Sequence, residues 1–450
     1  MSESKELGTK NIGELLWKFS VPAVIGMLVN ALYSVVDRIF IGRGVGSLAL
    51  SGVAITFPIT NIIMGIGMLI GAGAAAVVSI KLGQKKPEDA ERILGNAYTL
   101  TFILPILLTI LGLIFLEPLL LMFGASPETM PYAKQFASIL LAGAVLQNVG
   151  FGLNPIIRAE GDPKTAMFTM LIGAVLNFVF NPIFIFGLHM GVVGSALATI
   201  IAQAVCTIWV FLYFVKGKSL LKLKRINMKL DGQLVKEIIS IGMSPFIMQV
   251  AASAVTIIIN THLVAYGGDL AVGAFSLISS IAILILMPVF GINQGAQPII
   301  GYNYGADNIS RVKKTLFYGI LANTVLSTLG WILSELFSLQ IIRVFNDTDT
   351  QLIQIATNGL KLYLLAIFLV GSQAACVNYF QSIGKATHSL LLSLLRQVVI
   401  LIPLVIILPH FLGLNGIWLA GSVSDFLSFV VTFVFIGFEL KKLKQIQPLI

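Results

Sequence analysis

The chain has 450 residues, of which 57% are hydrophobic and only 11% are charged. A soluble protein carries about 25% charged residues, so this composition excludes an ordinary soluble domain and indicates a polytopic membrane protein. The formal net charge of +9 would suit a nucleic-acid partner, but the basic residues lie in short segments between apolar runs, where they set membrane topology; no nucleic-acid partner is expected.

Twelve apolar segments are long enough to cross a lipid bilayer as helices. The first is too long for a cleaved signal peptide, so it is expected to remain as the first span. Proline and glycine recur inside the segments, as membrane helices tolerate. The sequence predicts an all-α polytopic fold with spans near 15–41, 50–79, 92–116, 132–156, 165–187, 192–215, 237–264, 271–299, 314–336, 356–381, 387–409 and 414–439.

Lysine and arginine are distributed unevenly between the two sides of these spans. The two tails and the loops after even-numbered spans contain 22 of them, with Arg158 counted in the loop after span four, and the opposite side contains five. The other two, Lys18 and Arg396, lie inside spans. Because positively charged loops stay in the cytoplasm, both termini are expected there.

The two halves of the chain repeat each other at an offset of 222 to 224 residues. Pro22 corresponds to Pro245 in this alignment. Gly71 corresponds to Gly295 within a shared Gly-x-x-x-Gly-Ala pattern. Six spans per copy give both copies the same orientation, which is a parallel repeat of the kind found in transporters. We expect an N-terminal lobe at 1–215, a basic cytoplasmic linker at 216–236 and a C-terminal lobe at 237–450.

Asp37 is an acidic residue within the first span, about one turn from its outer end. A carboxylate inside the hydrocarbon costs about 2.5–3.5 kcal/mol on insertion scales, which makes it a candidate functional residue. The alternative is an interfacial acid paired with its neighbour Arg38. The repeat places Asn260 at the equivalent position, so the second lobe has no matching carboxylate.

Three polar residues are expected close to Asp37. Asn177 and Asn181 lie four residues apart, on one face of the fifth span and at a similar depth, and Tyr33 lies one turn before Asp37. Burial disfavours the charged form of a carboxylate, so Asp37 is expected to exchange a proton near neutral pH. The sequence therefore predicts a cation-coupling site formed by Tyr33, Asp37, Asn177 and Asn181.

A second pair of charges, Arg396 in span eleven and Asp425 in span twelve, is expected at matching depth in the second lobe. The pair is interpreted either as a structural ion pair or as part of substrate binding or gating. Amides and methionines in other spans could line an adaptable cavity, although each amide taken singly is better explained by a helix–helix hydrogen bond. The candidates for this cavity or for gating are Met27, Asn30, Met64, Gln147, Asn260, Gln294, Gln297, Arg396 and Asp425.

Enzymatic chemistry has no clear signature in the sequence. Lys216-Gly-Lys-Ser219 resembles the end of a phosphate-binding loop, but Leu212 occupies the position of the required first glycine. The four histidines and two cysteines lack ligand spacing. We expect neither an enzyme nor a metal site, and no cofactor apart from a coupling ion.

Several stretches together resemble the MATE family (multidrug and toxic compound extrusion). They are Val36-Asp37 with the following Ile39 to Gly42, Gly65 to Gly73, Asn181 to Gly187 before Gly191 to Ala196, and Gln294 to Gly305. Within the family they look like the bacterial branch of the DNA-damage-inducible and staphylococcal multidrug exporters.

This resemblance implies a V-shaped antiporter that exports bulky, often cationic drugs or dyes in exchange for H⁺ or Na⁺. It also implies that Asp37 is the coupling carboxylate and that the protein is a monomer in the bacterial inner membrane. Many relatives carry Asp where this chain has Asn181, so its site has one carboxylate instead of two.

A different class of function remains open at this point, namely a flippase for lipids or lipid-linked oligosaccharides. Such a protein predicts a more cationic central cavity than spans that contain only Lys18 and Arg396 would provide. A non-transporting scaffold is a further alternative. A major-facilitator transporter is disfavoured because the loop after span two lacks the Asp-Arg-x-Gly pattern.

Overall fold

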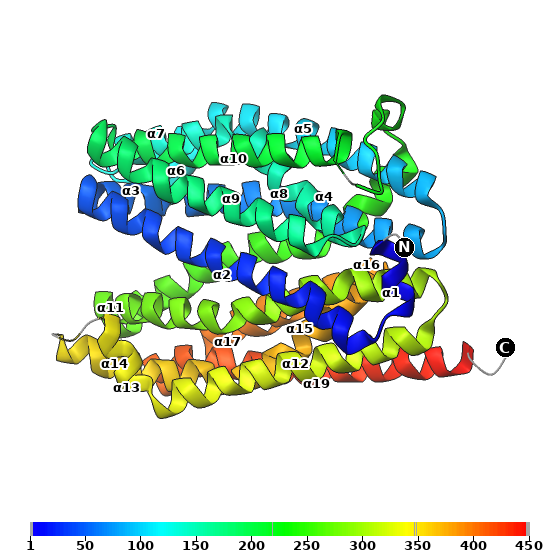
Figure 1. Ribbon diagram of the computed structural model, residues 1–450. Helices are drawn as coiled ribbons and strands as arrows, with labels where there is room; N and C mark the ends of the chain where they lie inside the picture. The colour runs from blue at the N-terminus through cyan, green and yellow to red at the C-terminus, as the bar shows by residue number, and fades with distance from the viewer. Residues whose placement is uncertain (1–2, 218, 346, 348, 447–450) are drawn as a thin grey trace.

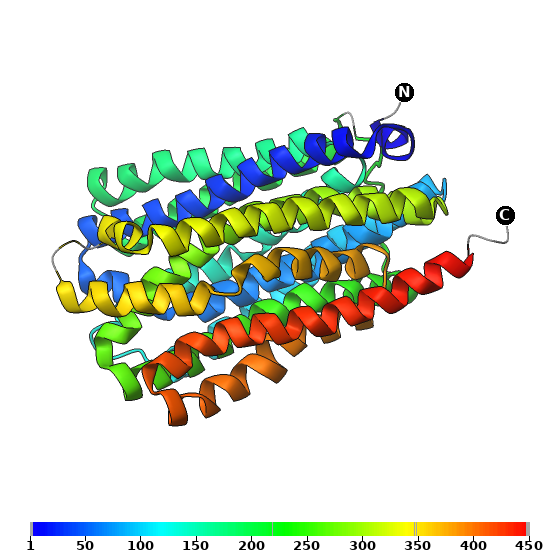
Figure 2. The same ribbon diagram turned by 90° about the horizontal axis from the view of Figure 1, so that it is seen from below.

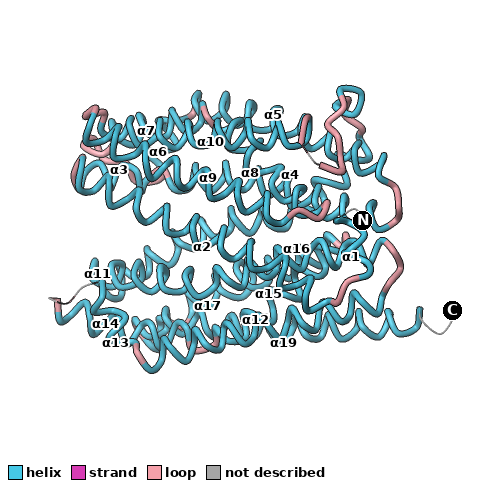
Figure 3. Tube along the Cα trace, viewed as in Figure 1, coloured by secondary structure: helices cyan, strands magenta, loops and turns pink. Residues whose placement is uncertain are grey.

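The computed structural model describes residues 3–217, 219–345, 347 and 349–446, and within them it contains helices and no strand (Figure 3). The first half has α1 (Glu3–Thr9), α2 (Ile12–Gly44), α3 (Ser47–Ile55), α4 (Phe57–Gly83), α5 (Pro87–Ile114), α6 (Leu116–Met122), α7 (Met130–Ala142), α8 (Ala144–Ala159), α9 (Pro163–Pro182), η1 (Ile183–Gly187), α10 (Gly191–Val215) and η2 (Arg225–Met228). The second half has α11 (Gly232–Gly305), α12 (Ile309–Leu336), α13 (Ser338–Phe345), α14 (Thr350–Leu364), α15 (Ile367–Ser382), α16 (Ala386–Leu394), η3 (Leu395–Leu401), α17 (Ile402–Ile407), α18 (Pro409–Leu412) and α19 (Leu414–Ile446).

The twelve predicted spans are confirmed within this described part of the chain. Ten helices are long and apolar enough to cross a membrane, and two bent helix pairs bring the number to twelve. The bends are 56° between α7 and α8 and 45° between α14 and α15. α11 comprises two spans that meet at Gly268, whose φ of 65° is readily available to glycine.

The helices form two bundles that run roughly parallel to each other. In Figure 1 the first half of the chain lies above the second, and the bundles separate toward the end opposite both termini. The view from below also places the N- and C-termini at one end (Figure 2). This is the two-lobe, V-shaped architecture that the internal repeat and the family resemblance predicted.

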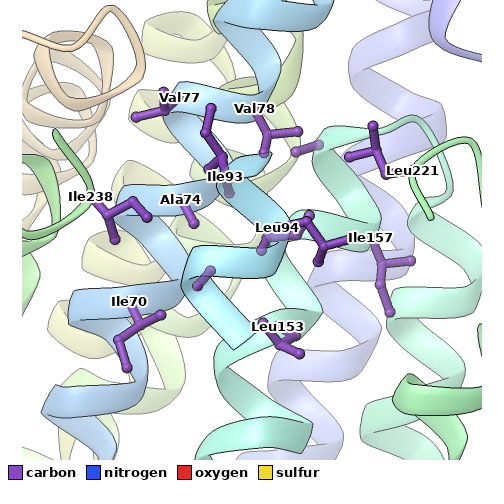
Figure 4. Packing of buried hydrophobic residues seen from close by; sticks show 14 of the residues in the cluster. Ile70, Ala74, Val77, Val78, Ile93, Leu94, Leu153, Ile157, Leu221 and Ile238 are labelled. Atoms are coloured by element: carbon purple, nitrogen blue, oxygen red, sulfur yellow. The ribbon is translucent and has the colours of Figure 1, made fainter. Parts of the chain in front are cut away.

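The core of the first bundle is built around the small residues of α4. Ala74 to Ala76 are at most 1% exposed, and they pack with Ile93, Leu94 and Leu153 (Figure 4). Small residues allow membrane helices to approach closely. Ile238, from the start of α11 in the second half, also belongs to this cluster.

The first span of each half packs partly against the other half. Leu15 and Phe19 at the start of α2 are buried in a cluster with Ile292 and Ile436. In the reciprocal contact, a Cβ on Gly242 of α11 would lie 1.7 Å from the carbonyl oxygen of Leu69. The expected division into lobes at 1–215 and 237–450 remains a prediction, and buried contacts cross that boundary in both directions.

Candidate functional site

Asp37 lies near the C-terminal end of α2 and faces α9 and α10. The Asn181 amide donates a hydrogen bond to Asp37 Oδ1, and Ser195 Oγ donates to the same oxygen over 2.7 Å. Asn181 is fully buried. The neighbouring Arg38 lies over the ring of Phe57 at 4.6 Å, so the arrangement does not match the alternative of an interfacial Asp37–Arg38 pair.

The polar network continues inward from Asp37. Asn181 Nδ2 donates to Asn177 Oδ1 over 3.2 Å, and Asn177 Nδ2 donates to Thr199 Oγ1 over 2.9 Å. Asn177, Thr199 and Tyr33 line a small cavity of about 50 Å³. The four residues predicted to form the coupling site thus lie in one region of the first lobe.

The sequence interpretation missed two members of this network, Ser195 and Thr199. Both lie on one face of α10 at i, i+4 spacing. The same spacing identified Asn177 and Asn181, but two hydroxyls in a helix usually bond to their own backbone. Their role becomes visible only when α10 is placed against α2.

A larger cavity of about 380 Å³ lies between the two lobes. Its wall includes Met27, Asn30, Met64, Gln294, Gln297 and Arg396 from the sequence-based candidates. Methionines from both halves give the wall a flexible apolar surface, and amides supply polar contacts.

Three of the cavity candidates lie outside the lining of both cavities: Gln147, Asn260 and Asp425. Gln147 lies one turn beyond Phe151, the outermost residue of α8 that lines the large cavity. Asn260 lies eleven residues beyond Gln249 on α11, which is about 16 Å along a helix. Both amides lie farther along their helices than the cavity wall extends.

The predicted ion pair in the second lobe is confirmed. Arg396 Nε donates to Asp425 Oδ1 over 2.7 Å. Arg396 belongs to the π-helical segment η3 and lines the large cavity, whereas Asp425 lies behind it on α19. π-helical segments are frequent at functional sites.

The position of Arg158 corrects the sequence analysis. It was assigned to the cytoplasmic loop after span four, but it lies in the last turn of α8, is 4% exposed and lines the large cavity. The helix continues past the end of the predicted span, and the polar turn 160–162 ends it. The cavity is therefore more cationic than the count of basic residues within spans indicated.

The small and large cavities share four lining residues. These are Asn30 on α2, Phe151 and Asn154 on α8, and Met170 on α9. The small cavity, which Asn177 and Thr199 of the network line, therefore shares part of its wall with the central cavity.

Twelve spans in two related bundles, with a cavity between them, define a membrane transporter. The chain belongs to the MatE family, whose family model matches residues 22–183 and again residues 245–407. The two matched regions begin 223 residues apart, in agreement with the offset of the internal repeat. The family resemblance is confirmed, and the chain is a multi-pass membrane transporter and not an enzyme.

Curated relatives and solved structures align along nearly the full chain. Multidrug export protein MepA of Staphylococcus haemolyticus (strain JCSC1435) is 27% identical over 427 residues, which cover 94% of each chain. The structure of MATE multidrug transporter DinF-BH in complex with rhodamine 6G is 41% identical, with a TM-score of 0.89 over 95% of this chain and 96% of that one. An outward-facing multidrug resistance MATE family transporter of the MOP superfamily is 26% identical, with a TM-score of 0.91 over 98% of each chain.

Proposed function

We propose that this transporter is a multidrug efflux antiporter, which exports bulky organic compounds across the bacterial inner membrane in exchange for H⁺ or Na⁺. The multidrug export proteins that align over 94% of the chain and the dye complex of a 41% identical transporter support export of such compounds. The excess of Lys and Arg on one side supports cytoplasmic termini. We expect a monomer.

One observation carries the antiport part of the proposal. Asp37 is held by Asn181 and Ser195 in a network that does not line the central cavity. Asn30 and Asn154, however, line both the small cavity beside this network and the central cavity. Gain or loss of a cation at Asp37 would change the charge beside this shared wall. That proximity allows ion binding and substrate binding to influence each other.

H⁺ is the simpler coupling ion for this site, because protonation of Asp37 needs no ligand besides the carboxylate, whereas Na⁺ would need several oxygen ligands. Asn181, which replaces the second carboxylate of many relatives, and Ser195 both donate to Asp37 Oδ1. The buried Asn181 Oδ1 has no hydrogen-bond partner among the described residues and is an oxygen that Na⁺ could use, so the test imposes the two gradients separately.

α2 is the element that would transmit this change to the rest of the molecule. Its outer part contains Asp37, its middle part lines the cavity through Asn30 and Met27, and its inner part packs on Gly291 and Gly295 of α11. Pro22 interrupts the helical hydrogen bonds between these parts. Bending or repacking of α2 would therefore change how the lobes meet, as alternating access requires.

The test uses purified protein in liposomes with rhodamine 6G as the transported dye. A pH gradient and a Na⁺ gradient are imposed separately on wild type, Asp37→Asn and the control Glu117→Gln. Glu117 forms an exposed ion pair with Lys134 away from both cavities. We expect dye movement under the pH gradient, loss of that movement in Asp37→Asn and wild-type movement in the control.

Dye movement under the Na⁺ gradient alone would identify Na⁺ as the coupling ion. If Asp37→Asn abolished that movement, Asp37 would remain the proposed site of the ion. Full gradient-driven export by Asp37→Asn would refute the role of Asp37. Absence of movement under both gradients would contradict antiport and favour the flippase alternative, which labelled lipids would then test.

A further inference from the structure

The central cavity has an uneven set of charges. Among its lining residues the charged side chains are Arg158 and Arg396, and no Asp or Glu of the described chain belongs to the lining. A cavity dedicated to simple organic cations would be expected to provide a carboxylate, because opposite charges attract more strongly in a poorly solvated space.

The two arginines differ in how their charge is balanced. Arg396 is paired with Asp425, so this corner of the cavity is close to neutral. Arg158 has no carboxylate oxygen within 4.0 Å in the part of the chain that the structure describes. Arg158 is therefore the cavity's uncompensated positive charge.

The acidic residues that follow Arg158 in sequence have other partners. Glu160 accepts hydrogen bonds from Ser219 Oγ and from the backbone N–H of Leu221. Asp162 accepts bonds from Thr165 at the start of α9. Neither forms an ion pair with Arg158.

Arg158 retains hydrogen-bonding capacity. Nη1 donates to Asn154 Oδ1 over 2.6 Å, and this is the bond that holds the guanidinium in place. A guanidinium has five N–H donors in a planar fork that matches a carboxylate. Because burial of an unpaired charge is costly, a bound anionic group would stabilise this site.

The same cavity offers acceptors on other walls. Gln294, Gln373 and Gln397 line it, and the Oε1 atom of each is buried without a hydrogen-bond partner among the described residues. Amide oxygens accept from N–H groups. The cavity wall also contains apolar side chains such as Met248 and Phe290.

We propose that Arg158 forms a carboxylate-binding subsite of the central cavity, in which the guanidinium binds the carboxylate of an amphipathic zwitterionic substrate and the unpartnered glutamine oxygens accept from its N–H donors. The apolar body of such a compound would contact the methionine and phenylalanine side chains. This inference rests on the proposed efflux function and assigns a specificity-determining residue to its cavity.

The test compares two dyes that differ in a single group. Rhodamine 110 has a free carboxylate, and rhodamine 123 is its methyl ester; both have the same N–H donors. Binding to purified protein in detergent is measured by fluorescence anisotropy for wild type, Arg158→Gln and Arg158→Lys. The assay needs no ion gradient, so its result is independent of whether transport is coupled.

We expect wild type to bind rhodamine 110 more tightly than its ester. Arg158→Gln should weaken rhodamine 110 binding about tenfold, the loss typical of a charge-assisted hydrogen bond, and should change ester binding less than twofold. Arg158→Lys should retain part of the preference, because it keeps the charge without the planar fork.

Ester binding by Arg158→Gln also shows that the variant is folded. If Arg158→Gln binds neither dye, the ratio of the affinities of Arg158→Lys for rhodamine 110 and rhodamine 123 tests the inference instead. An equal change for both dyes, no change for either, or a wild-type preference for the ester would overturn the inference. The proposed efflux function would stand in those cases if rhodamine 6G is still exported.

Discussion

The two lobes arose from one repeated unit, yet they handle their buried charges differently. In the first lobe Asp37 is surrounded by the neutral donors Asn181 and Ser195. In the second lobe Asp425 is paired with Arg396. A carboxylate held by neutral groups can lose or gain its charge with modest rearrangement, whereas the charge of a carboxylate paired with a guanidinium is balanced by that partner.

In the proposed antiport, ion exchange would therefore belong to the first lobe alone. An offset of 223 residues gives Asn260 for Asp37 and Leu404 for Asn181, and the offset of 222 that relates Gly194 to Gly416 gives Ile417 for Ser195. Neither the carboxylate nor its two donors are present there. The second lobe instead provides a fixed pair of charges at the cavity wall.

The largest effect is expected from moving the carboxylate between lobes. Asp37→Asn should reduce gradient-driven dye export to the background of empty liposomes, and Asp37→Asn combined with Asn260→Asp should remain inactive because Leu404 and Ile417 provide no donors. The liposome assay measures both. Export by the double variant would show that the lobes are interchangeable and would end the comparison.

The next effect concerns the stability of the second lobe. Asp425→Asn leaves Arg396 without a carboxylate and should destabilise the protein by about 3 kcal/mol, the lower end for breaking a buried pair, because Arg396 is partly accessible from the cavity. Thermal unfolding in detergent measures the change. Arg396→Gln combined with Asp425→Asn should recover most of it; no recovery would mean that Asp425 has a role beyond the pair.

A smaller effect is expected from removing one donor to Asp37. Ser195→Ala should lower gradient-driven export about threefold to tenfold, since Asn181 still donates to the same oxygen. Initial rates of dye movement measure it, with Ser138→Ala as a control on an exposed turn of α7. A loss as complete as that of Asp37→Asn would assign Ser195 a direct part in ion binding.

The smallest effect separates stability from transport. Glu160 follows α8 outside the spans, and its burial beneath the linker raises its pKa to about 7, although Tyr213 and Ser219 lower it in part. Because the raised pKa favours the protonated folded state, stability is full below about pH 4.5 and is lost as the pH rises through 7.

Glu160→Gln should therefore flatten the dependence of the melting temperature on pH between about 4.5 and 7, with a change of roughly 1–3 kcal/mol. Export should keep its dependence on pH, which then reports on Asp37. Unchanged melting curves would indicate that Glu160 is ionised in the folded protein throughout this range.

Much of the fold could be predicted because the bilayer restricts it. Spans need about 20 apolar residues, so the runs in the sequence located all twelve, and the repeat predicted two bundles of equal orientation. The bends at Gly143 and Ala366 could not be read from hydropathy, since the residues on either side are equally apolar. The packing of α2 against the second half was also invisible, because it depends on contacts between residues far apart in the chain.

The candidate site was predicted where charge or spacing was unusual. Asp37, Asn181 and the Arg396–Asp425 pair are such cases. The sequence did not identify Ser195, because hydroxyl side chains are common in helices. It did not identify Arg158, because this residue lies just beyond the end of its apolar run. The role of a residue near a helix end depends on whether the helix continues, which a neighbouring polar turn decides.

The packing of each first span against the other half has a consequence for biosynthesis. Leu15 and Phe19 emerge early from the ribosome, but their buried partners include Ile292 and Ile436. The core around Ala74 similarly lacks its partner Ile238 until synthesis of the second half has begun. Neither bundle can complete its packing during translation of its own half, so final assembly must wait for nearly the whole chain to enter the membrane.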